Sequence, residues 1–138
     1  DDVLRVPAGA QGLDIVRRAT PSTSEALLPT VLEGASGFLY YVSIAGVTGT
    51  KSFAEDDVRA AVARLKTKGG LPVAVGFGIR TPEQAGAIAR FADGAAVGSA
   101  IVDLVAKNAA NGGNRESLVS EMLNFCHLLA DAVHSARG

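Results

Sequence analysis

Four short apolar runs alternate along the chain with stretches that have the periodicity of amphipathic helices, and this alternation constrains the fold most strongly. The runs are LDIVRRA from Leu13, FLYYVS from Phe38, LPVAVG from Leu71 and GAAVGS from Gly94, each of strand length and bounded by turn residues. Strands that alternate with helices in this way pack into a parallel sheet with right-handed crossovers. We therefore predict an α/β fold of four βα units followed by one closing helix.

Helix start and stop residues lie at the expected places between these runs. The predicted helices begin at the cap Ser24, at the acids after Ala54, at the cap Thr81 and near Ser99, and a last helix covers about Glu116 to Ala136. Gly34 is expected to end the first of them. The loop NAANGGN, which begins at Asn108, should separate the last two.

Glycine-containing turns follow the second, third and fourth runs, as AGVTGT, GFGIRT and GSAIV. Glycine lets the backbone approach a ligand closely, and the free N–H groups at a helix N-terminus favour anions. A single glycine between a strand and a helix is more often only a turn device. The three turns together favour one shared phosphate site.

Two architectures accommodate this order of elements. A doubly wound sheet binds its ligand at a switch point and a (β/α)₈ barrel at the carboxyl ends of its strands, and the strands alone leave both open. In barrels, the loops after strands seven and eight frequently form a phosphate site. If the third and fourth runs are those strands, Gly78 helps to hold a phosphate. The 138 residues, against about 250 for a full barrel, then correspond to a C-terminal half, strands five to eight, plus a C-terminal helix.

The strings GFLYYVSIAGVTGTK, LPVAVGFGIRTPEQA and DGAAVGSAIV closely resemble segments of the tryptophan synthase α chain family, and GLDIVRRATPSTS resembles that family's fifth strand and the loop after it. The resemblance covers most of Gly12 to Val105. It implies a TIM-barrel lyase of tryptophan biosynthesis, which cleaves indole-3-glycerol phosphate to indole and glyceraldehyde 3-phosphate by retro-aldol chemistry. It also implies no cofactor in the α chain itself, and a partner β chain with pyridoxal phosphate in an α2β2 complex.

The resemblance implies roles for individual residues as well. Gly49, Gly78, Gly98 and Ser99 would bind the substrate phosphate, and their N–H groups and the Ser99 hydroxyl suit an anion on physical grounds too. Thr48 would lie in the loop that closes over the substrate. Tyr40 would line the site near the catalytic glutamate.

Two departures from the family pattern matter. Ile44 stands where many members have an arginine before AGVTG, which puts any loop-closing role of that arginine in doubt here. The family's catalytic glutamate and aspartate belong to the second and third barrel units, so no catalytic residue is expected in this half, and the chain alone is expected to be inactive. The carboxylates that are present should cap helices or face solvent; they are Asp14, Glu55, Asp56, Asp57 and Glu83.

Composition limits the classes of partner that the chain can bind. Hydrophobic residues make up 48% and charged residues 20% of the chain, which is typical of a protein that buries a core, and the net charge of -1 provides no field for nucleic acid. Cys126 is the single cysteine, so no internal disulfide can form. No apolar run approaches the roughly 20 residues that cross a bilayer. We expect a cytoplasmic protein without a metal and without nucleic-acid or membrane partners.

Two hypotheses of different classes follow. In the first, residues 1–138 form a single domain, the C-terminal half of a tryptophan synthase α chain, which binds phosphate and requires its missing N-terminal half. A half barrel exposes two strand edges and apolar faces. In the alternative, the same half barrel is a non-catalytic module for phosphate-ligand binding or assembly. Another phosphate-binding barrel is the runner-up among enzymes.

Overall fold

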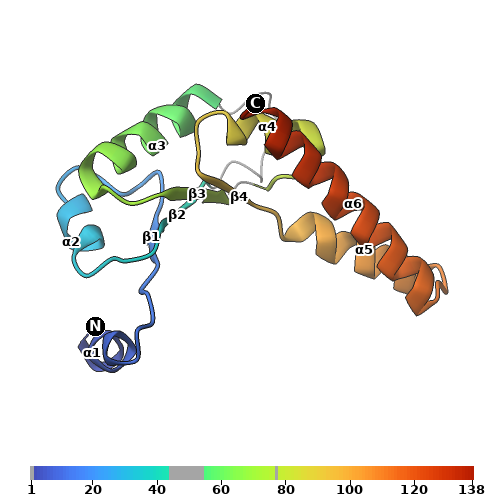
Figure 1. The fold of residues 1–138 in the computed structure, drawn as a ribbon, viewed down its shortest axis with the longest axis horizontal. Coiled ribbons are helices and arrows are strands. Elements are labelled where there is room, and N and C mark those ends of the chain that lie inside the picture. The colour runs from blue at the N-terminus through green and yellow to red at the C-terminus, as the bar shows by residue number, and fades with distance from the viewer. Residues whose placement is uncertain (1, 44–54, 77) are drawn as a thin grey trace.

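A computed structural model describes residues 2–43, 55–76 and 78–138, which include four parallel strands in one sheet (Figure 1). The strands are β1 (Arg17–Ala19), β2 (Leu39–Val42), β3 (Val73–Gly76) and β4 (Gly94–Ala96). The helices are α1 (Asp2–Ala10), α2 (Leu28–Leu32), α3 (Glu55–Gly69), α4 (Pro82–Ala89), α5 (Ser99–Ala110) and α6 (Arg115–Ser135). The predicted α/β fold is confirmed.

The strands lie in the sheet in the order in which they occur along the chain, β1-β2-β3-β4. Tyr40 of β2 is in register with Ala74 of β3, which is in register with Gly94 of β4. A doubly wound sheet reverses its strand order at a switch point. The described strands contain no such reversal, so the order favours the winding of a barrel.

The core lies between the sheet and the helices on one of its faces. Alternate residues of β2 and β3 are buried on this face, namely Leu39, Tyr41, Val73 and Val75. The buried stripe of α3, which consists of Val58, Val62 and Leu65, belongs to the same cluster. Figure 1 shows α3 and α4 on this side of the sheet, with α6 beside α4. The strand period of about 2 residues and the helix period of about 3.6 residues thus place the apolar side chains of the sheet and of α3 on the faces that pack together.

The opposite face of the sheet is open. An apolar hollow of about 360 Å³ on it is lined by Val16, Phe38, Tyr40, Ala74, Gly94, Ala95 and Ala96. Phe38 is 39% exposed there. Among the described strands, β1 and β4 each have one neighbour only. The two free edges and the open apolar face expected of a half barrel are therefore present.

Helix α6 packs closely on α4. A Cβ at the buried Gly86 of α4 would stand 3.1 Å from the carbonyl oxygen of Ala132. The side of α6 that faces the core carries Phe125, Leu129 and Val133. This close approach makes α6 an integral part of the packing.

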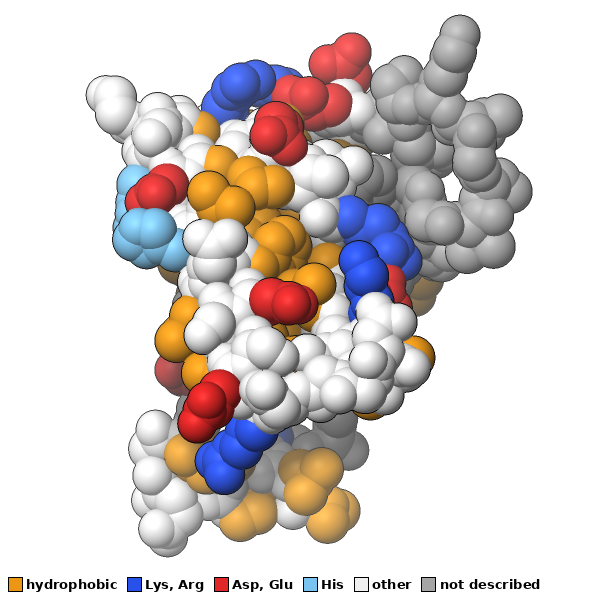
Figure 2. Space-filling model, turned by 90° about the vertical axis from the view of Figure 1, so that its right-hand side faces the viewer, with side chains coloured by type: hydrophobic (Ala, Val, Ile, Leu, Met, Phe, Trp, Pro, Cys, Tyr) orange, Lys and Arg blue, Asp and Glu red, His pale blue; other side chains and the backbone are white. Residues whose placement is uncertain are grey.

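The outer surfaces of α5 and α6 remain partly apolar. Figure 2 shows that side of the molecule, with hydrophobic side chains in the middle, the histidines at the left, and Lys and Arg at the right, the top and the bottom. Exposed apolar residues of the two helices are Val102, Val105, Val119, Leu123 and Leu128. Cys126, His127 and His134 are exposed as well.

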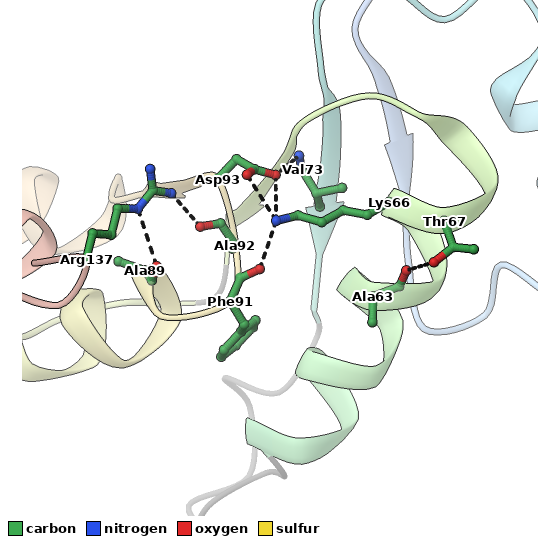
Figure 3. A network of polar contacts seen from close by, with 9 residues as sticks. All are labelled: Ala63, Lys66, Thr67, Val73, Ala89, Phe91, Ala92, Asp93 and Arg137. Atoms are coloured by element: carbon green, nitrogen blue, oxygen red, sulfur yellow. Dashed lines mark hydrogen bonds and ion pairs between the residues drawn. The ribbon is translucent and has the colours of Figure 1, made fainter.

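A polar network fixes the amino ends of β3 and β4 (Figure 3). The Asp93 carboxylate accepts the N–H of Val73 at 2.8 Å and pairs with Lys66 of α3 at 2.9 Å, while Arg137 donates to the carbonyl of Ala92 at 2.6 Å. Burial raises the pKa of the Asp93 carboxyl. The Val73 hydrogen bond, Lys66 and Arg137 outweigh burial and hold this pKa below its ordinary value. The network lies at the edge opposite to the carboxyl ends of the strands.

Element boundaries differ from the prediction at several places. Helix α1 was not predicted. Strand β1 begins at Arg17 rather than at Leu13, so Asp14 precedes the strand instead of lying inside it. The reason is local, because the N–H of Ile15 donates to the Ser36 hydroxyl at 2.8 Å.

Two helix ends also differ. Helix α2 begins at Leu28, after a turn in which the Ser24 carbonyl accepts the N–H groups of Leu27 and Leu28, while the predicted stop Gly34 has a φ of 68°. Helix α5 continues to Ala110, into the segment predicted as a loop.

Candidate functional site

The candidate site is the edge of the sheet at which β2, β3 and β4 end. The carboxyl ends of parallel strands lie at the same edge, where α/β barrels bind their ligands. Gly78, Gly98 and Ser99, which were predicted to bind phosphate, follow β3 and β4 there. Thr48 and Gly49, together with Ile44, fall within residues 44–54 and lie outside the described residues.

The turn after β3 depends on Gly78. This residue has a φ of 48°, a conformation that favours glycine, while a Cβ would meet no atom within 4 Å. Backbone conformation rather than lack of space therefore requires glycine here. The next residue, Ile79, is 2% exposed and anchors the turn in the core. The exposed backbone at Gly78 is thus held at a fixed place.

Helix α4, which follows this turn, is closed at its N-terminus by its own side chains. The Thr81 hydroxyl accepts the N–H of Gln84 at 3.3 Å, and the Gln84 side chain accepts the N–H groups of Arg80 at 2.8 Å and Thr81 at 3.3 Å. Pro82 in the first helical position has no N–H. Glu83 in the first turn adds a negative charge, and hydrogen bonds from its own N–H and from Thr81 hold its pKa below the ordinary value. An anion finds few donors at this helix.

The N-terminus of helix α5, in contrast to that of α4, is not closed by side chains of the described residues. Its N-cap is Gly98, which has no side chain, and its first turn contains no acidic residue. Within residues 2–43, 55–76 and 78–138, the N–H groups of Ser99 and Ala100 have no hydrogen-bond partner. Unsatisfied N–H groups at the positive end of a helix dipole attract anions. Of the N-termini of α4 and α5, the one of α5 suits a phosphate.

A side-chain ion pair joins the turn to α5. Arg80 Nη1 lies 2.7 Å from Asp103 Oδ2, and the two side chains are 60% and 58% exposed. They border a hollow of about 210 Å³ whose other lining residues are Ala100, Leu104, Lys107 and Phe125. No pattern in the sequence points to this pair, because its members are 23 residues apart and each is an ordinary exposed residue.

Tyr40 reaches the same region from the open face of the sheet. A Cβ at Gly76 would overlap with the Tyr40 hydroxyl, so the phenol lies directly on the last residue of β3. Gly78 follows two residues later. Tyr40 and the turn are therefore brought together, and Gly76 is the residue that sequence reasoning missed.

Two of the carboxylates at the helix starts have contacts that indicate a structural role. Glu55 pairs with Arg59 at 2.6 Å, and Glu83 lies in the capped turn of α4. In the part of the chain that the structure describes, no three His, Cys, Asp or Glu residues cluster as a metal site would require. None of the described helices has the length and apolar character needed to span a bilayer.

A family model described as "Tryptophan synthase alpha chain" matches residues 1–134. The chain belongs to the tryptophan synthase alpha chain family. The tryptophan synthase alpha chain of Novosphingobium aromaticivorans is 56% identical over 126 residues, which are 91% of this chain and 45% of that protein.

Solved structures of the family agree with the described fold. Tryptophan synthase subunit alpha from Legionella pneumophila matches with a TM-score of 0.81 and 27% identity, over 97% of this chain and 47% of that one. A tryptophan synthase structure from Mycobacterium tuberculosis matches with a TM-score of 0.76 and 30% identity, over 95% and 46% of the two chains. The chain thus spans about half the length of the relatives it matches. It corresponds to the C-terminal half of the (β/α)₈ barrel of the tryptophan synthase alpha chain family, with a final helix.

Proposed function

We propose that the protein that contains this chain cleaves indole-3-glycerol phosphate to indole and glyceraldehyde 3-phosphate. In this proposal, residues 1–138 supply the phosphate-binding half of the active site. One observation carries the proposal. At the carboxyl edge of the sheet, the N-terminus of α5 has N–H groups that pair with none of the described residues and no acid in its first turn, next to the left-handed turn at Gly78. Family membership supports the reaction itself.

The phosphate would be held by the N–H groups of Ser99 and Ala100, the Ser99 hydroxyl and the backbone at Gly78, with Gly98 leaving room for its approach. Hydrogen bonds to a charged group are each worth about 1.5–3 kcal/mol. Gly49 remains a further predicted donor, and Thr48 a predicted loop residue. Binding energy from a remote phosphate orients the reacting part of a substrate, which is how this half would contribute to the rate.

Tyr40 would line the cavity between the phosphate and the reacting carbons. Retro-aldol cleavage needs an acid that protonates the indole carbon and a base that removes a hydroxyl proton. We assign both to carboxylates in the part of the protein that precedes this chain in its relatives. In this proposal the α chain uses no cofactor, works in the cytoplasm and delivers indole to a β chain that holds pyridoxal phosphate.

The test uses the full encoded protein and measures indole release and the affinity for inorganic phosphate. Ser99→Ala removes one hydroxyl, and Ser99→Pro also removes an N–H at a helix position that tolerates proline. We expect the KM for the substrate to rise with Ser99→Ala and to rise about tenfold further with Ser99→Pro, which is the effect of about 1.4 kcal/mol. Arg115→Pro, at the first position of the separately capped α6, is the matched control.

Each result decides a different part of the proposal. If the unmodified protein releases no indole, the proposed reaction is refuted. Phosphate binding without turnover would then support the alternative, a non-catalytic binding module. If indole is released but Ser99→Pro leaves the KM and the phosphate affinity unchanged, the placement of the phosphate at α5 is wrong.

A further inference from the structure

We infer that Arg80 and Asp103 are positioning residues of the phosphate site, which set the distance between the turn at Gly78 and the N-terminus of α5. The inference rests on the proposed function. The guanidinium and carboxylate approach to 2.7 Å. Arg80 is two residues beyond Gly78, and Asp103 is about one helical turn beyond Ser99, so the pair joins the two segments that would hold the phosphate.

Arg80 is fixed to two helices at once. Its backbone N–H donates to the Gln84 side chain of α4 at 2.8 Å, while its side chain bonds to Asp103 of α5. Among the described residues, no other hydrogen bond or ion pair joins the turn of residues 78–81 to α5. Packing of the buried Ile79 and Ala100 holds the turn and α5 in the core, and this contact adds a direct connection between their exposed parts.

The side chains of the pair lie along the flank of α5 and not in front of its first residue. The hollow that they border is lined by one stripe of α5, at Ala100, Leu104 and Lys107, and by Phe125 of α6. A phosphate at the N-terminus of α5 would lie beyond Ser99, at the end of the helix axis. Arg80 would thus act through backbone geometry rather than by touching the anion.

An electrostatic role of Arg80 makes a different prediction. If the pair acted only through its charges, removal of the Asp103 carboxylate would leave Arg80 and Lys107 as unopposed cations and would strengthen phosphate binding. If the pair positions the two segments, the same change weakens binding. The sign of the effect of Asp103→Asn therefore separates the two roles.

The experiment measures the dissociation constant of inorganic phosphate by calorimetry, together with kcat and KM for indole release, in the full encoded protein. The variants are Arg80→Gln, Asp103→Asn, both together, and the exchange of Arg80→Asp with Asp103→Arg. Lys107→Gln is the control, because it removes a cation from the same hollow, and no ion pair of Lys107 with another described element is seen.

We expect each single change to weaken phosphate binding about two- to fivefold, as an exposed ion pair allows, and to raise KM in parallel at unchanged kcat. The double variant should bind no more weakly than either single one, and the exchange should restore binding to within about twofold. Tighter binding by Asp103→Asn, additive losses, or a lowered Tm with unchanged phosphate affinity would each overturn the inference. Failure of the unmodified protein to bind phosphate would instead refute the proposed function.

Discussion

The hydroxyl of Tyr40 occupies the space that a side chain at Gly76 would need, at the end of β3. The close fit couples the open face of the sheet to the turn that contains Gly78. It also explains why GFG, rather than a single glycine, ends this strand: the first glycine accommodates a phenol and the second a left-handed backbone.

Gly76→Ala is therefore expected to displace Tyr40 and to destabilise the fold by about 1–3 kcal/mol, the usual cost of overpacking. Urea denaturation of Gly76→Ala, Tyr40→Ala and the double variant measures this cost, and the double variant should lose less than the sum of the singles. Gly9→Ala in α1 is the control, since a Cβ there meets no atom within 4 Å. Strictly additive losses would show that the two residues do not interact.

Gly78 is required for its backbone conformation, so the choice of replacement matters more than its size. Gly78→Ala should cost about 1–2 kcal/mol, whereas Gly78→Asn should cost less, because asparagine adopts the left-handed region more readily. Thermal unfolding of both variants tests this order. An equal cost for Ala and Asn would mean that contacts, and not the φ of 48°, determine the residue.

The Asp93 carboxylate makes the free energy of unfolding depend on pH. Its folded pKa is lowered, so its contribution is present above the unfolded value of about 3.8 and is lost as the pH falls through the lower folded pKa. Asp93→Asn should lower the free energy of unfolding at pH 7 by less than about 1 kcal/mol, because the carboxylate is partly exposed.

The difference in the free energy of unfolding between Asp93→Asn and the unmodified chain should decrease below about pH 4. Urea midpoints from pH 7 to 2.5 provide the measurement, with the exposed Glu121→Gln as control. A difference that stays constant across this range would contradict the role of the charge.

The contact between α4 and α6 leaves no room for a branched side chain at Gly86. Gly86→Val should push the helices apart and cost about 2 kcal/mol or more, since the Cβ alone would stand 3.1 Å from the Ala132 carbonyl. Ala87→Val, at a half-buried position of the same helix, controls for the lower helix propensity of valine. Equal stability of the two variants would show that α6 adapts to the larger residue.

Most of the scaffold is predictable from the sequence because each element carries its own pattern. The apolar stripe of α3 and the Thr81 cap with Pro82 are both local signals that can be recognised in the amino-acid sequence alone. Helix α1 escaped prediction because it has no buried stripe: Val3, Leu4 and Val6 are all exposed, and Pro7 lies inside the helix.

The candidate site was only partly predictable, for a physical reason. Gly78, Gly98 and Ser99 stand out because conformation and helix ends restrict which residues occur there. Contacts between distant segments leave no local trace, so neither the fit of Tyr40 against Gly76 nor the bond between Arg80 and Asp103 could be read from spacing. The roles of Thr48 and Gly49 stay predictions.

The strand order β1-β2-β3-β4 has a consequence for synthesis of the chain on the ribosome. Because domains fold progressively as the polypeptide emerges, each newly made strand finds its hydrogen-bonding partner already formed and exposed just before it. The pairings among these four strands can thus form in one direction, one unit at a time. The slow pairing of remote strands is then left to the free edges of β1 and β4, where closure of a barrel needs strands from outside this chain.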